Sequence, residues 1–219
     1  MLLASGKLAG NGLPDASGPR SDVKVLIFSD IHADYRALDR ILACPADVYV
    51  LAGDLTLFGR GLNTAGEKLH PLGERLWVMP GNHETEAEIA AFCNQHRFLF
   101  FHRAVLQRGD VNFAGLGYSN PTPFNTPGEY TEERIAQELE AFRGLANLVL
   151  ICHCPPYGTR LDEVSPGRHT GSQVLRAFVE KEQPRYLICG HIHECQGKED
   201  LIGQTYCFNA GKLGYLLEA

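Results

Sequence analysis

The sequence has no long apolar segment and no excess of basic residues. No apolar run approaches the length that spans a bilayer. The first four residues, Met-Leu-Leu-Ala, are too few for the apolar region of a signal peptide and follow no positive charge. Lys and Arg number 20 against 26 Asp and Glu, so the basic surface typical of nucleic-acid-binding proteins is missing. We expect a cytoplasmic protein with no membrane anchor and no strong nucleic-acid footprint.

The cysteines do not form the paired pattern of a zinc site. There are seven, an odd number, and several lie inside apolar runs. Cys152-His153-Cys154 has no matching second pair of cysteines, which makes it a weak zinc motif. We expect buried, reduced thiols.

The chain contains no internal repeat and no linker that would divide it. Residues 1–21 hold four Gly, two Pro and few large apolar groups, which predicts a flexible N-terminal tail. Residues 22–219 are long enough to bury a large core of their own. We expect one domain over 22–219.

Short apolar runs alternate with segments in which apolar residues recur at the spacing of a helix. Runs rich in β-branched residues predict strands at 23–29, 47–52, 75–79, 98–106, 111–116, 147–151 and 185–189. Helical spacing predicts helices around 37–42, after Glu84, at 131–142 and at 172–182. Residues 56–66 and 155–171 read as loops, and 195–217 as a β-meander. This order predicts two packed sheets with helices outside, a fold of the α/β (α+β) class.

Metal-competent side chains follow these apolar runs. Residues i and i+2 of an extended segment face the same side, about 6.5–7 Å apart, so Asp30 can join His32 and His191 can join His193. Two carboxylates, one amide and four imidazoles suit Mn, Fe or Zn better than Ca or Mg. Seven ligands exceed the three or four of one catalytic transition ion. The pattern predicts two divalent transition metal ions held by Asp30, His32, Asp54, Asn82, His153, His191 and His193.

These residues also occur in a recognisable order. The chain reads Asp30-x-His32, Gly53-Asp54, Gly81-Asn82-His83-Glu84, His153 and Gly190-His191-x-His193. Five motifs in this order resemble the calcineurin-like metallophosphoesterase superfamily, in its small, compact bacterial and archaeal form. The resemblance implies a four-layer αββα sandwich of two mixed β-sheets flanked by helices. It also implies that Asp30, His32 and His193 hold one ion, that Asn82, His153 and His191 hold the other, and that Asp54 bridges both.

The resemblance further implies a metal-dependent phosphohydrolase acting on a small-molecule phosphoester. Two ions, with manganese first and iron or zinc as alternatives, would activate a hydroxide for in-line attack on phosphorus. His83 would bind no metal; it would contact the phosphate and protonate the leaving alkoxide. The Asp-Arg-Gly of the family's protein phosphatases is missing after Asp54, where the chain continues Leu-Thr-Leu. We therefore expect a phosphodiesterase rather than a phosphoprotein phosphatase.

Two alternatives stay open. A phosphomonoesterase would use the same metal ligands, and a non-catalytic metal-binding scaffold for partner proteins is the alternative of another class. Candidate substrate contacts are Asn82 and His83, with Asn120, Tyr157 and His169 in or next to the loops that should surround the site. Asp34 is interpreted as a helix cap and Glu84 as a helix-start residue.

Overall fold

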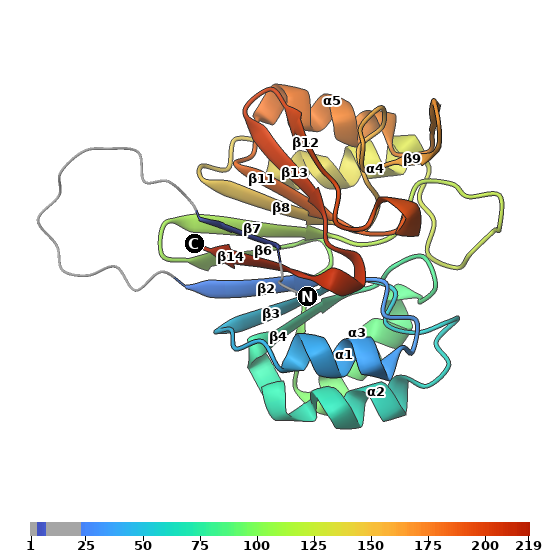
Figure 1. Cartoon of the computed structure of the whole chain (residues 1–219), viewed down its shortest axis with the longest axis vertical. Coiled ribbons are helices and arrows are strands. Elements are labelled where there is room, and N and C mark those ends of the chain that lie inside the picture. Colours follow the sequence, from blue (N-terminus) through green and yellow to red (C-terminus); the bar gives the residue numbers. More distant parts are fainter. Residues whose placement is uncertain (1–3, 8–22) are drawn as a thin grey trace, which may run out of the picture.

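Two six-stranded β-sheets lie face to face between two layers of helices (Figure 1). The computed structural model describes residues 4–7 and 23–219. The arrangement is the αββα sandwich of two mixed sheets that the sequence predicts, and that prediction is confirmed.

The first sheet has the strand order β1-β14-β2-β3-β4-β5. Strands β2 to β5 run parallel, β14 is antiparallel to β2, and β1 is parallel to β14. The strands are β1 Ala4–Lys7, β2 Lys24–Phe28, β3 Val48–Ala52, β4 Leu76–Met79, β5 Leu99–Phe100 and β14 Tyr215–Glu218.

The second sheet has the order β12-β13-β11-β8-β7-β6. Its four inner strands run parallel, and the two edge strands are antiparallel to their neighbours. The strands are β6 Ala104–Arg108, β7 Val111–Leu116, β8 Leu148–Cys152, β11 Tyr186–Cys189, β12 Glu199–Ile202 and β13 Thr205–Asn209. A separate hairpin is formed by β9 Glu163–Ser165 and β10 Arg168–His169.

Helices cover the outer face of each sheet (Figure 1). The first sheet is covered by α1 Tyr35–Leu42, α2 Leu62–Leu69 and α3 Glu86–His96. The second is covered by α4 Glu132–Leu139 and α5 Gln173–Glu182. Short 3-10 segments occupy His70–Arg75, Glu140–Phe142, His193–Cys195 and Gly211–Leu213. Within the described ranges, no helix is long and apolar enough to cross a bilayer.

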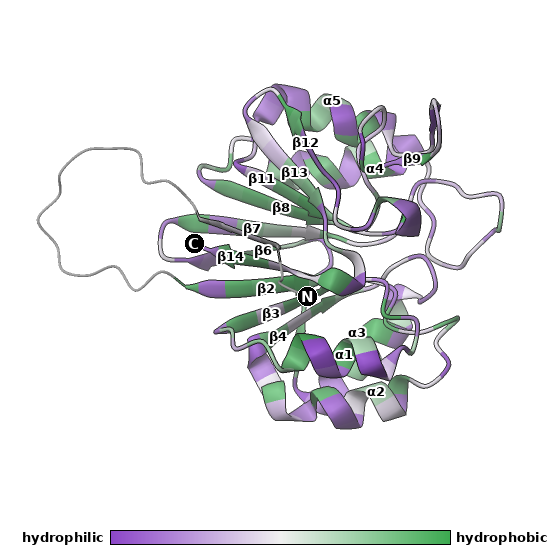
Figure 2. Ribbon diagram, viewed as in Figure 1, coloured by the Kyte–Doolittle hydropathy of each residue, from purple (hydrophilic) through white to green (hydrophobic). Residues whose placement is uncertain are grey.

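The inner strands are buried on both faces because side chains alternate along a strand. In β2, Val25 and Ile27 pack between the two sheets, whereas Leu26 and Phe28 pack against the helices. Figure 2 shows the result as hydrophobic strands at the centre and mixed helices outside. This double burial explains why the strands read as continuous apolar runs in the sequence.

The structure differs from the sequence prediction in the N-terminal region and in two loops. Residues 4–7, inside the expected tail, form β1 because they pair with β14; the rest of 1–21 lies outside the described residues. The expected loop at 56–66 ends in the start of α2, whose Ala65 and Leu69 are buried against the first sheet. The expected loop at 155–171 contains the β9–β10 hairpin.

Two predicted β-segments are divided between the sheets. The single strand expected at 98–106 is β5 in the first sheet and β6 in the second, since the chain turns between them at Arg103 (φ 54°). The prediction of a β-meander over 195–217 is likewise wrong at its C-terminal end, because β14 lies in the other sheet from β12 and β13. The N–H of Ser29 bonds to Gly211 O (3.0 Å), which brings the chain to the first sheet, where β14 pairs with β2.

We predict that Asp34→Ala lowers the free energy of unfolding by about 1 kcal/mol. Asp34 is the N-cap of α1, and its Oδ1 accepts the N–H of Ala37 (3.0 Å), as the sequence predicts. Urea titration measures the loss. Asp34→Asn is the matched control because it keeps an acceptor oxygen; equal losses for the two variants would contradict the capping role.

Candidate metal centre

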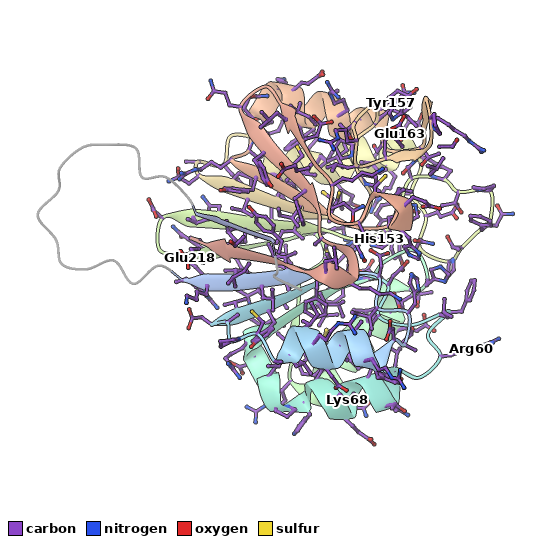
Figure 3. The ribbon with its side chains drawn as sticks, viewed as in Figure 1. Arg60, Lys68, His153, Tyr157, Glu163 and Glu218 are labelled. Atoms are coloured by element: carbon purple, nitrogen blue, oxygen red, sulfur yellow. The ribbon has the colours of Figure 1, made fainter. Side chains whose placement is uncertain are left out.

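The seven candidate ligands all lie just beyond the C-terminal ends of parallel strands. Asp30, Asp54 and Asn82 follow β2, β3 and β4 of the first sheet, and His153 and His191 follow β8 and β11 of the second. Figure 3 labels His153 near this edge, between the two sheets. Because the strands of each sheet are parallel, these ends meet along one edge of the sandwich.

The backbone turns sharply at the ligands. Asp30, His32, Asp54 and His191 all have positive φ, between 46° and 68°. The expectation that Asp30 and His32 sit in an extended segment is therefore wrong, although the two side chains do converge. The turns are held by bonds between loops: the N–H of Asp30 bonds to Gly53 O, and that of His32 to Asp54 O. Such left-handed residues persist only where the surroundings fix them.

The first ligand group is Asp30, His32 and His193. Asp30 Oδ2 accepts from Ser29 Oγ (2.5 Å) and from the N–H of His191 (2.9 Å). Its Oδ1 is buried without a hydrogen-bond partner and faces His193 Nε2 (3.5 Å) and His32 Nε2 (3.8 Å). The two imidazole Nε2 atoms are 3.0 Å apart. One oxygen is held by the protein, and the other is free to bind an ion.

The second ligand group is Asn82, His153 and His191. The Nδ1–H of His153 donates to Ala52 O (2.9 Å), which turns Nε2 toward Asn82 Oδ1 (3.0 Å). Asn82 Nδ2 donates to Thr126 Oγ1 (3.1 Å), and this bond aims the amide oxygen at the site. His191 places a ring nitrogen within 4.8 Å of ligand atoms of Asp54 and His153.

Asp54 stands between the two groups. Its Oδ1 accepts the N–H of His83 (2.9 Å). Its Oδ2 lies 3.6 Å from His32 Nε2 and 3.4 Å from His153 Nε2, one imidazole from each group. Asp54 is therefore placed within reach of both groups. His83 also puts a ring nitrogen within 4.8 Å of ligand atoms of His32 and Asp54, so distance alone allows it to be a ligand.

The charges of the site fit divalent cations. Burial opposes protonation of His153, but the Asp54 and Asp30 carboxylates outweigh it and raise the pKa of His153 to about 9. Burial and the charge of His153 lower the pKa of His191 to about 4. Without metal, a proton on His153 compensates the two carboxylates, and a cation can take over that role. The mixed O and N donors and the unpartnered Asp30 Oδ1 fit transition ions.

The thiols beside His153 do not fit a metal role. Cys152 and Cys154 are buried in the apolar cluster under α4 and α5. Burial raises the pKa of Cys154 to about 12, so the thiolate that a metal requires is disfavoured. All seven cysteines are free; six are buried, as expected, whereas Cys44 is partly exposed.

Two motif glycines are required for close approach. A Cβ on Gly81 would lie 2.0 Å from Asp54 Oδ1, and one on Gly190 would lie 2.0 Å from Ser29 Oγ. Any larger residue there would displace the carboxylate or its hydroxyl partner. These glycines let the two loops pack directly on the ligands.

Both ligand groups open into one cavity of about 770 Å³. His83 lines it, as do the candidate substrate contacts Asn120, Tyr157 and His169. Asn120 Nδ2 donates to Thr170 O (2.9 Å), while its buried Oδ1 has no partner. Of the predicted site residues, only Asp30 and His153 do not line this cavity; both are buried beside ligands that do.

The prediction that Glu84 is a helix-start residue is wrong. Helix α3 begins at Glu86 behind the N-cap Thr85, so Glu84 is not its start. Glu84 is fully buried and accepts from Thr56 N (2.7 Å), Thr56 Oγ1 (2.9 Å) and Gly81 N (3.4 Å). Burial and the charge of Asp54 raise its pKa to about 8. Through these hydrogen bonds Glu84 connects the loop after β3 to the loop after β4.

The residues that aim the ligands were missed by the sequence analysis. Ser29 holds Asp30, and Thr126 holds Asn82 from a loop 44 positions away. Ser29 is adjacent to a ligand, so it could have been suspected. Nothing local in the sequence points to Thr126.

We predict that metal binding releases about one proton per protein at neutral pH, mainly from His153. Below its pKa of about 9 His153 holds a proton that competes with the ion, so apparent affinity rises with pH up to that value. Mn²⁺ calorimetry in buffers of different protonation enthalpy measures the release. The same titration above pH 9 should show less release; heats independent of buffer near pH 7 would contradict the prediction.

Comparison with known proteins agrees with this geometry. The family model of calcineurin-like phosphoesterases matches residues 23–195. Uncharacterized protein MJ1162 of Methanocaldococcus jannaschii is 38% identical over 202 residues, covering 89% of this chain and 91% of that protein. UPF0046 protein K07C11.7 of Caenorhabditis elegans is 27% identical over 214 residues, covering 85% of this chain and 70% of that protein. The protein TT1561 of Thermus thermophilus shares the fold, with a TM-score of 0.66 at 18% identity over 87% of this chain and 90% of that one. The chain belongs to the calcineurin-like phosphoesterase family.

Proposed function

We propose that this protein is a metal-dependent phosphohydrolase that prefers phosphodiesters to phosphomonoesters. One observation carries the proposal: two groups of ligand atoms, sharing Asp54, open into a single cavity large enough for an organic phosphoester. Burying so many convergent polar groups without a cation would be costly. That cost argues against a scaffold that binds no metal.

The ligands divide as the family resemblance implies. Asp30, His32 and His193 would hold one ion and Asn82, His153 and His191 the other, with Asp54 within reach of both. Manganese is the first candidate, and iron and zinc suit the same donors. When bound, two such ions supply a nucleophile from water at neutral pH and positive charge for the phosphoryl oxygens.

His83 is the proton donor in this proposal. Its backbone is fixed by the bond to Asp54, and its ring lies edge-on to His32 and to Phe58, with centroids 5.0 and 4.6 Å away. Its buried Nδ1 has no protein partner, so no hydrogen bond commits the ring to a neighbour. The ring lines the cavity, where it can reach a leaving oxygen.

The preference for diesters is supported by the extent of the cavity. Its walls include Pro121 to Phe124 of one loop and Tyr157 and His169 of another. A diester carries a group on each side of phosphorus, and this wide cavity provides room beyond the phosphate itself. Asn120, Tyr157 and His169 are the proposed contacts for those groups.

We predict that His83→Gln keeps both metal ions but slows hydrolysis of an alkyl diester by about 10²–10⁴-fold. The loss should be smaller for a p-nitrophenyl ester, whose leaving group needs less protonation. Metal analysis and kcat on both esters measure the effect.

The matched control is His70→Gln, which removes a histidine outside the cavity. Unchanged alkyl-diester activity in His83→Gln would refute the acid role. Loss of metal in that variant would instead make His83 a ligand.

The proposed function itself is tested by a panel of phosphomonoesters, cyclic nucleotides and linear diesters with Mn²⁺, Fe²⁺ or Zn²⁺. We expect the highest kcat/KM on a diester, lost in Asp54→Asn together with bound metal. A higher kcat/KM on the monoesters than on the diesters would identify a phosphomonoesterase. No hydrolysis of an aryl diester by the metal-loaded protein would favour the non-catalytic metal-binding scaffold.

A further inference from the structure

The β9–β10 hairpin brings a second set of polar side chains into the cavity. Arg168 and His169 are consecutive, yet both line the cavity beside the candidate metal ligands. Consecutive residues of a regular strand point to opposite faces. The pairing register shifts between Arg168 and His169, and such a bulge re-aims side chains. The hairpin therefore presents two basic side chains to the cavity.

His169 is held in place by a buried carboxylate. Its Nδ1–H donates to Oδ1 of Asp162 (2.8 Å), which is fully buried. The other ring nitrogen, Nε2, is left for a ligand. Asp162 also orders the surrounding loop by accepting backbone N–H bonds from Gly158, Thr159, Thr170 and Gly171.

Arg168 has no carboxylate partner among the described residues, and its side chain is exposed. Glu132 also lines the cavity, but its Oε2 accepts from Ser172 Oγ (2.8 Å) and Val174 N (2.9 Å). An unpaired guanidinium beside an anchored imidazole is an arrangement that binds phosphate or carboxylate oxygens.

We propose that Arg168 and His169 form a second anion subsite, separate from the metal ligands. The substrate is then a phosphodiester that bears a further negative group, such as a terminal phosphate, on one of its ester arms. This rests on the proposed function, since the metal ligands must take the scissile phosphate. The cavity volume of about 770 Å³ accommodates both groups at once.

The test compares two esters that differ in one phosphate: p-nitrophenyl thymidine 5′-phosphate and the same ester with a 3′-phosphate. Their leaving group and scissile diester are identical. With Mn²⁺ bound, we expect kcat/KM to be about tenfold higher for the 3′-phosphorylated ester, mainly through KM, as one charge-assisted contact provides. In Arg168→Gln and in His169→Gln the ratio should fall toward one.

Arg160→Gln is the matched control. Arg160 is exposed in the same loop but does not line the cavity, so its loss removes a charge without touching the subsite. It should keep the wild-type ratio. A ratio near one in the wild type overturns the proposal. Equal slowing of both esters in Arg168→Gln also overturns it, since Arg168 would then serve the scissile phosphate.

Calorimetry separates this proposal from the proposed function. Thymidine 5′-phosphate and thymidine 3′,5′-bisphosphate are titrated into the Mn²⁺-loaded protein. Tighter binding of the bisphosphate, lost in Arg168→Gln, supports the subsite even if neither ester is hydrolysed, in which case only the phosphodiesterase proposal fails. Equal binding of the two nucleotides, or no binding of either, overturns the subsite.

Discussion

The whole site depends on the Asp54 carboxylate, which faces an imidazole from each sheet. Its Oδ2 lies 3.6 Å from His32 of the first sheet and 3.4 Å from His153 of the second. Away from this edge the two sheets meet mainly through apolar packing, which is non-directional and tolerates small displacements. Charged contacts at this edge require exact placement, and the bond from the N–H of His83 to Asp54 Oδ1 supplies it. The edge where the sheets are joined by charge is also the edge that opens into the cavity.

The general fold could be predicted because the inner strands are buried on both faces. Val25 to Phe28 must be apolar at every position, so the strand and the polar residues that follow it are visible in the sequence. The positions of the candidate ligands could be predicted for the same reason, since they stand where these runs stop. What placed Asp30 beside His32, however, was a left-handed turn and not an extended segment. The convergence of these two side chains was predicted through an incorrect local conformation.

Features that depend on distant partners could not be predicted. Glu84 looks like the acidic start of a helix, and only its burial against Thr56 reveals another role. Asp162 reads as an ordinary loop residue until four backbone N–H groups converge on it. The division of residues 98–106 between two sheets depends on a turn at Arg103, a residue type that rarely adopts positive φ. Local composition carries no signal for any of these.

The return of β14 to the first sheet has a consequence for biosynthesis. Strand β2 pairs with β3 on one side and with β14 on the other, and β14 lies at the far end of the described chain. While the polypeptide is being made, one edge of β2 stays without its partner until the last strand emerges. An apolar edge of this kind invites pairing with other chains. The first sheet, which carries Asp30, Asp54 and Asn82, can therefore close only after β14 has been made, and until then its open edge favours aggregation.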